Sequence, residues 1–156
     1  MHVEERSYHH GDLRRALIEE GLRLARDGGL GALGLREITR SVGVTANAAY
    51  RHFGDRHDLV VAVSVEAREL LAQRIARAMH DVRADRPAPE RALRGLRGFC
   101  EGYIGFARME RGWFELACYS QHAPEGAVSV LSGSEPLPPP YVQLNDALDV
   151  LSLIHI

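Results

Sequence analysis

Residues 43–59 have the sequence GVTANAAYRHFGDRHDL. The side chains of its first half are small, and several of those in its second half are aromatic or basic. Gly43 can adopt, at little cost, the left-handed conformation that ends a helix. Thr45 can then cap a new helix, because a threonine hydroxyl accepts a hydrogen bond from an otherwise free backbone N–H. We therefore predict a tight turn at Gly43 followed by a short helix over residues 46–53.

Helical signals flank this stretch on both sides. Apolar side chains recur at helical spacing over residues 13–24, and the glycine-rich segment DGGLGALG at residues 27–34 then interrupts the helix. A second short helix is predicted over residues 35–42. A single apolar stripe predicts a long helix over residues 57–80; its members are Leu59, Val63, Ala67, Leu70, Ile75 and Met79.

Two short helices joined by a glycine turn have the geometry of a helix-turn-helix motif. The second helix of such a motif enters a DNA major groove, which is about 12 Å wide, and small residues at its start let the backbone approach the bases. Asn47 can pair with adenine. Tyr50 by its hydroxyl, His52 by a ring N–H and Arg56 by its charge can hold phosphates. The residues expected in the core are Ile38, Val44, Ala49 and Phe53.

The second half of the chain begins after the proline-containing boundary DVRADRPAPE. A helix is predicted over residues 89–109, with an apolar stripe formed by Leu93, Leu96, Cys100, Tyr103 and Phe106. Beside it runs a second stripe of Gly95, Gly98, Gly102 and Gly105. Each glycine costs a helix roughly 1 kcal/mol relative to alanine. Close packing against another helix and a floor for a small molecule are two compatible explanations.

Further helical segments follow in this half. A short helix is predicted over residues 111–121, a loop over 123–140, and one more helix from residue 141. The aromatic residues Trp113, Phe114 and Tyr119 are expected either in the core or around a ligand cavity.

Composition sets limits on the function. The chain has 156 residues, of which 46% are hydrophobic and 26% charged, an ordinary balance for a globular protein. No run approaches the roughly 18 apolar residues of a membrane span. All 19 basic residues are arginine and the net charge is −2, so a basic patch for nucleic acid must come from placement. Cys100 and Cys118 fit no zinc spacing and are expected to be reduced core residues.

The segments YHHGDLRRALIEEGLRLARDGG and LREITRSVGVTANAAYRHFGDRHDL resemble, in order and spacing, the TetR/AcrR family of bacterial transcriptional regulators. The resemblance covers about residues 8–80. The later segment GYIGFARMERGWFELACYS resembles the ligand domain of the WHG-type subgroup, which often opens with YHHGDLR. The resemblance implies an all-α protein with a helix-turn-helix three-helix DNA-binding domain at residues 8–56. A long connecting helix at 57–80 and a partial helical ligand-binding and dimerisation domain at 88–150 follow.

By position, the resemblance also assigns site residues. The residues that would face bases are Arg36, Ala46, Asn47, Ala48, Tyr50 and Arg51, and those that would face phosphates are Thr45, His52 and Arg56. The residues assigned to the ligand site are Phe99, Tyr103, Phe106, Trp113, Phe114 and Tyr119. This chain departs from the family pattern at three positions: Arg56 replaces the usual lysine, Gly34 replaces a serine or threonine, and Thr39 replaces an alanine.

The implied function is ligand-responsive repression in the cytoplasm. A homodimer of the full-length protein would bind a palindromic operator in double-stranded DNA, and a small-molecule effector would shift the dimer to a spacing that does not fit. The long fourth helix would transmit the change, since it touches both domains. No catalytic set or phosphate-binding glycine loop is present, so no enzymatic activity, cofactor or metal is expected.

Two alternatives remain at this stage. The last six residues, LSLIHI at 151–156, match the translation of a transposon end used to fragment DNA, so we expect a non-native tail. The chain would then be a truncated fragment without the helices that usually form the dimer, and would associate weakly. The second alternative is a helical metal-binding hydrolase that uses His52 and His57. Against it, Asp55 and Asp58 are explained as a helix cap and a first-turn charge.

Overall fold

The computed structural model describes residues 10–80, 87–119 and 139–153, and every regular element in these ranges is helical. In chain order the elements are α1 (His10–Gly28), the 3₁₀ turn η1 (Gly29–Ala32), α2 (Leu35–Val42), α3 (Ala46–Tyr50), α4 (Arg56–Met79), α5 (Ala88–Met109), α6 (Arg111–Tyr119) and α7 (Pro139–Leu153). The predicted all-α class is confirmed. Most of the predicted loop at 123–140 lies outside the described residues, as do residues 154–156 of the expected tail, whereas residues 151–153 belong to α7.

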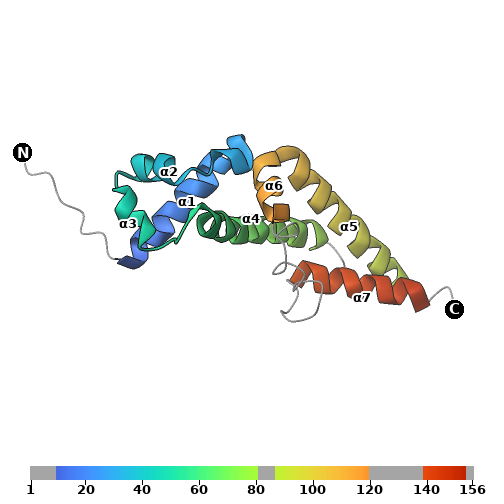
Figure 1. The fold of residues 1–156 in the computed structure, drawn as a ribbon. Coiled ribbons are helices and arrows are strands. Elements are labelled where there is room, and N and C mark those ends of the chain that lie inside the picture. Colours follow the sequence, from blue (N-terminus) through green and yellow to red (C-terminus); the bar gives the residue numbers. More distant parts are fainter. Residues whose placement is uncertain (1–9, 81–86, 120–138, 154–156) are drawn as a thin grey trace, which may run out of the picture.

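The molecule is elongated along α4 (Figure 1). Helices α1, α2 and α3 gather around the start of α4, and α5 and α7 lie along its other end. Helix α6 sits between these two groups, where it contacts α1, η1, α4 and α5. The helix-turn-helix region and the C-terminal helices therefore occupy opposite ends of one long helix.

The turn chemistry of the helix-turn-helix region agrees with the sequence. Helix α2 has the predicted bounds, and Gly43 after it has a φ of 80°. The Thr45 hydroxyl oxygen accepts a hydrogen bond of 3.3 Å from the Ala48 N–H and so caps α3. Helix α3 is shorter than predicted: it ends at Tyr50, because the following N–H groups of His52 and Phe53 both turn back to the carbonyl of Ala49.

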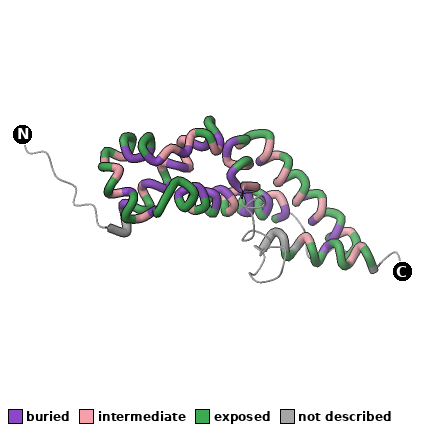
Figure 2. Tube along the Cα trace, viewed as in Figure 1, coloured by how far each residue is buried: buried purple, intermediate pink, exposed green. Residues whose placement is uncertain are grey.

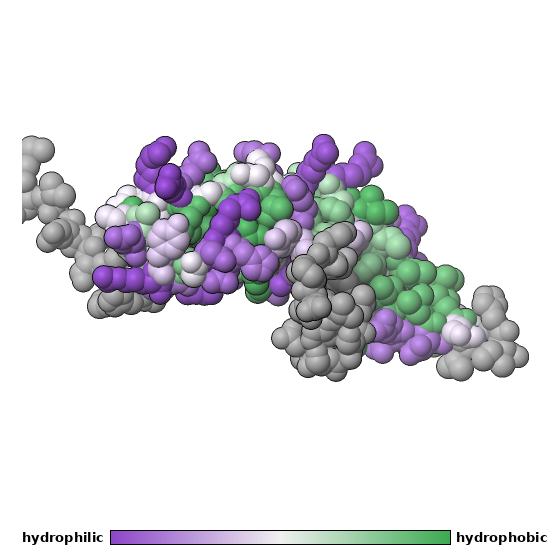
Figure 3. Space-filling model, viewed as in Figure 1, coloured by the Kyte–Doolittle hydropathy of each residue, from purple (hydrophilic) through white to green (hydrophobic). Residues whose placement is uncertain are grey.

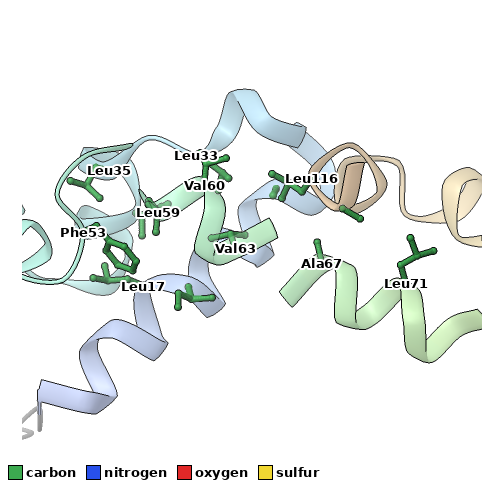
Figure 4. Packing of buried hydrophobic residues seen from close by; sticks show 14 of the residues in the cluster. Leu17, Leu33, Leu35, Phe53, Leu59, Val60, Val63, Ala67, Leu71 and Leu116 are labelled. Atoms are coloured by element: carbon green, nitrogen blue, oxygen red, sulfur yellow. The ribbon is translucent and has the colours of Figure 1, made fainter. Parts of the chain in front are cut away.

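One hydrophobic core runs through both halves of the molecule. Leu17, Phe53, Leu59 and Val63 are buried where α1, α3 and α4 meet, and the same cluster continues to Leu116 on α6 (Figure 4). Buried positions recur along the whole length of α4 and alternate with exposed ones (Figure 2). The predicted α4 stripe is buried along its length except at Leu70, which is half-buried, whereas the neighbouring Leu71 is 3% exposed.

The predicted apolar face of α5 is only partly correct: Phe106 is buried, whereas two other members are exposed. Leu93 is 57% exposed and Cys100 is exposed, whereas the buried face is Ala92, Gly95, Gly98, Gly102 and Phe106. The glycine stripe is therefore the face that packs on α4. A Cβ on Gly98 would lie 2.7 Å from the Ala78 carbonyl oxygen, and one on Gly102 would lie 2.7 Å from the Ile75 Cα. The two backbones approach so closely that no side chain fits between them, which supports the packing explanation at these two positions.

The cysteines also differ from the expectation. Both are free, but Cys100 is exposed on the outer face of α5 and is not a core residue. Cys118 on α6 is half-buried, and this burial raises the pKa of its thiol above the ordinary value. The periodicity placed Cys100 with the apolar stripe, but Cys100 and Leu93 lie on the exposed side of α5.

Helix α6 is fastened to the C-terminal part of α1. Arg26 donates two hydrogen bonds of 2.8 Å to the carboxylate of Glu110, and this contact raises the pKa of Arg26 above its ordinary value. The Trp113 indole N–H donates a hydrogen bond of 2.7 Å to the Leu22 carbonyl. The Arg26 guanidinium also lies 5.0 Å from the centre of the Trp113 ring. Gly112 lies against the carbonyl of Ala25, where a Cβ would overlap with the oxygen.

We expect Gly102→Ala to lower the free energy of unfolding by about 1–3 kcal/mol, because the new methyl group would press on backbone that cannot turn away. Thermal unfolding followed by circular dichroism would show a Tm lowered by several degrees. Gly105→Ala is the matched control. Its methyl group would meet only the end of the Arg74 side chain, at 3.7 Å, so it should keep or raise the Tm. An unchanged Tm for Gly102→Ala would contradict the close contact.

Loss of the α3 cap should also be measurable. We expect Thr45→Ala to lower the free energy of unfolding by about 1 kcal/mol, because the Ala48 N–H loses its side-chain acceptor. Thr45→Ser keeps the hydroxyl and should keep the stability. Urea unfolding of the two variants tests this, and an equal loss in both would show that the hydroxyl contributes nothing as a cap.

Candidate nucleic-acid interface

Helix α3 presents one face to solvent and one to the core. Ala49 is fully buried, and Tyr50 is 53% exposed. Asn47 and Arg51 are also exposed. Positions three and four residues apart share a helix face, so Asn47, Tyr50 and Arg51 form one exposed face. Ala48, predicted on this outer side, is half-buried and packs against the core, because the short helix lies close to α1 and α2. Ala46 is partly exposed at the start of the helix.

Helix α2 contributes a second exposed face. Arg36 and Arg40 are both exposed and lie one turn apart, whereas Leu35, Ile38 and Thr39 are buried. Thr39, which replaces the alanine usual in the family, fits here because its hydroxyl donates a hydrogen bond of 3.0 Å to the Arg36 carbonyl. At the start of α2, Gly34 supplies no side-chain cap, as its sequence predicts.

Three exposed arginines on and beside α2 and α3 lack, among the described residues, the carboxylate partners that other arginines have. Within the described ranges, Arg36, Arg40 and Arg51 form no ion pair. Other described arginines do lie within 4 Å of carboxylates, as in the pairs Arg15–Glu19, Arg23–Glu20, Arg26–Glu110, Arg94–Glu90 and Arg97–Glu101. A net charge of −2 therefore coexists with an arginine-bearing face on α2 and α3.

The residues predicted to hold phosphates are placed differently from one another. Thr45 is exposed at the start of α3, and its hydroxyl proton stays available while its oxygen caps the helix. His52 is half-buried after α3. Arg56 donates from Nε to the Leu33 carbonyl and from Nη2 to the Leu30 carbonyl, both at 2.7 Å. Two donors of Arg56 are thus already used by the protein backbone.

One basic residue near this face was missed by the sequence analysis. The Arg14 guanidinium of α1 lies 5.3 Å from the centre of the Phe53 ring, beside the end of α3. Arg14 is exposed and so adds a cation to this end of the molecule. Nothing in the local sequence pairs residues 14 and 53, because the contact depends on how α1 crosses α3.

The six aromatic residues assigned to a ligand site pack largely on one another. Ring-centre distances are 6.0 Å for Phe99–Tyr103, 5.2 Å for Tyr103–Phe114 and 6.5 Å for Phe106–Trp113. The sixth, Tyr119, places its hydroxyl 3.4 Å from Nδ1 of His57 at the start of α4. Phe106 is 4% exposed, and the other five are partly buried against the core cluster.

Several surface pockets border the described C-terminal helices, and two of them bear on the proposed ligand site. Phe106 and Trp113 line one of about 220 Å³, together with Gly105 and residues of α4. A larger one, of about 630 Å³, lies between α4, α5 and α7; its lining includes Met79, Ala92, Gly95 and Ala147 but none of the six aromatic residues. Apolar surface gathers over this part of the molecule (Figure 3). Gly95 and Gly105 of α5 therefore line pockets, Gly102 lies at the contact with α4, and Gly98 lies at that contact and also borders a further pocket.

The residues of the hydrolase alternative do not assemble a site in the described ranges. No group of three or more His, Cys, Asp or Glu side chains in these ranges is arranged to hold a metal ion. His57 instead lies beside the Tyr119 ring. None of the described helices is both long enough and apolar enough to cross a membrane.

Comparison with known proteins identifies the same region. The profile of the family "Bacterial regulatory proteins, tetR family" matches residues 17–63, which include α2 and α3. The HTH-type transcriptional regulators Rv1816 and MT1864 of Mycobacterium tuberculosis and Mb1846 of Mycobacterium bovis are each 32% identical to the chain over 97 residues. The match covers 62% of this chain and 36% of each relative, so the chain spans little more than a third of their length.

A solved structure shares the fold over nearly the whole chain. This is a protein of unknown function from Rhodococcus sp. RHA1, with a TM-score of 0.62 and 24% identity; the match covers 96% of this chain and 84% of that one. At this identity it supports the fold alone. The helix-turn-helix geometry, the family match and the named relatives agree, and they identify residues 17–63 as a domain of the tetR family of bacterial regulatory proteins.

Proposed function

We propose that this chain regulates transcription by inserting α3 into the major groove of double-stranded DNA. The observation that carries the proposal is the division of α3, in which Ala49 is buried and Asn47, Tyr50 and Arg51 face solvent. A helix that reads bases needs such a face at its start, free of contacts with the rest of the protein. The turn at Gly43 and the Thr45 cap present the start of the helix outward.

The exposed side chains suggest a division of labour. Arg36, Asn47, Tyr50 and Arg51 would contact base edges, since arginine and asparagine have the donors that guanine and adenine recognise. The small residues Ala46 and Ala48 would let the helix approach, with Ala48 contributing less because it is half-buried. Thr45 and His52 would hold phosphates, and Arg14 beside Phe53 would extend this contact along the DNA backbone.

Regulation is proposed to work as repression relieved by a small molecule. A homodimer of the full-length protein would place two α3 helices about 34–36 Å apart, which matches a palindromic operator. An effector bound among the C-terminal helices would favour a different spacing, provided that its affinity for the two states differs. The two pockets beside α4 support a site for such a molecule in this half. Action on chromosomal DNA places the protein in the cytoplasm.

Base selection by α2 and α3 provides the test. We expect Asn47→Ala and Arg36→Ala each to reduce discrimination between the preferred duplex and a mismatched one by about 1–3 kcal/mol. The measurement is selection of a preferred duplex from a random library, followed by competition binding with single mismatches.

Arg97→Ala on α5 is the matched control, because this arginine is exposed, pairs only locally with Glu101 and lies on the helix at the other end of α4. It should leave the discrimination unchanged. A parent chain that enriches no sequence, or three variants that behave alike, would refute the assignment of α3 as a base-reading helix.

A further inference from the structure

The backbone of η1 is held by Arg56. This residue begins α4, and its guanidinium donates hydrogen bonds to two carbonyls of the segment between α1 and α2, those of Leu30 and Leu33. We call this pair of hydrogen bonds the fork. Hydrogen bonds from a charged donor are stronger than neutral ones. Leu33 directly precedes the start of α2, and Arg56 comes shortly after α3. The fork thus joins the segment before the helix-turn-helix motif to the helix after it.

The opposite side of the same backbone is held by Glu115 of α6. One carboxylate oxygen of Glu115 accepts a hydrogen bond of 3.3 Å from the Leu30 N–H. Gly29 has a φ of +58° and lies directly under this carboxylate, where a Cβ would overlap with Oε2. A side chain at this position would be strained by the left-handed conformation, and it would also displace the Glu115 carboxylate.

The backbone of Leu30 is consequently bound by both α4 and α6. Its carbonyl binds Arg56 of α4, and its N–H binds Glu115 of α6. Helix α6 is itself fixed to α1 by the Arg26–Glu110 pair and by the Trp113 indole. A displacement of α6 relative to α1 would move Glu115, and Leu30 would carry that displacement to the fork of Arg56.

We propose that Arg56 is a positioning residue for DNA binding, which sets the helix-turn-helix motif through η1, and that Glu115 conveys the position of α6 to the same backbone. The inference rests on the proposed DNA-binding function and replaces the phosphate contact that the sequence suggested for Arg56. Arginine suits this role because its planar fork supplies two donors in fixed directions. Lysine would keep the charge but would lack the Nε donor to Leu33.

The test uses the full chain and a duplex of mixed sequence, with binding measured by fluorescence anisotropy at several salt concentrations and well below the Tm. We expect Arg56→Lys, Arg56→Gln and Glu115→Gln each to weaken binding several-fold and to lower the Tm. The slope of log K against log salt should stay unchanged, since no phosphate contact is lost. The Tm loss of Arg56→Gln combined with Glu115→Gln should be smaller than the sum of the two single losses, because both act through Leu30.

Three results would overturn the inference. A slope flattened by about 0.9 in Arg56→Gln, with normal binding in Arg56→Lys, would make Arg56 a phosphate ligand. A lowered Tm with unchanged DNA affinity would make the fork purely structural. If the Tm loss of the double variant equals the sum of the two single losses, Glu115 and Arg56 act independently and not through Leu30.

The control variants Arg97→Gln and Glu101→Gln remove an exposed pair on α5 and should change neither the affinity nor the slope. If the parent chain shows no salt-dependent binding to duplex DNA, the proposed function fails first and this inference fails with it. If the parent chain binds duplex DNA but the variants do not give the expected results, this inference fails and the proposed function stands.

Discussion

The inner face of α4 is the constraint on which the rest of the structure depends. Its 24 residues span about 36 Å at the usual helical rise, which is long enough to serve both ends of the molecule. Leu59 and Val63 complete the core under α3, and Ile75 lies against Gly102 of α5. Because one helix supplies both contacts, the helix-turn-helix end cannot be placed independently of the C-terminal helices.

Local signals in the sequence were sufficient for the helix-turn-helix region. Gly43, Thr45 and Phe53 each act within a few residues of themselves: the first by its conformation, the second as a cap and the third by burial. Helix α5 shows where such reasoning failed. Its apolar periodicity selected Leu93 and Cys100, but the buried face consists mainly of glycines, because two helix backbones in direct contact leave no room for side chains. Hydrophobicity alone carries no signal for that kind of packing.

Parts of the candidate site depend on contacts that are distant in the sequence. Residue type suggested a phosphate contact for Arg56, but its partners lie 23 and 26 residues away in the segment between α1 and α2, and backbone carbonyls do not appear in any side-chain pattern. Trp113 is similar: its indole reaches Leu22, 91 residues away. The Arg26 guanidinium also lies over the Trp113 ring. Displacement of Trp113 would therefore break a partly buried hydrogen bond, so a ligand in this region would bind more readily beside the ring than in its place.

The overall charge of the chain is a poor guide to its affinity for DNA. At physiological ionic strength the Debye length is about 8 Å, so a phosphate beside α3 experiences mainly the charges nearest to it. Several acids that make the net charge negative lie within ion pairs on α1 and α5, where arginines already neutralise them. Within the described part of the chain, Arg36, Arg40 and Arg51 have no such partners. Local placement, which composition does not reveal, therefore allows a slightly acidic chain to carry a cationic face on α2 and α3, as the proposed function requires.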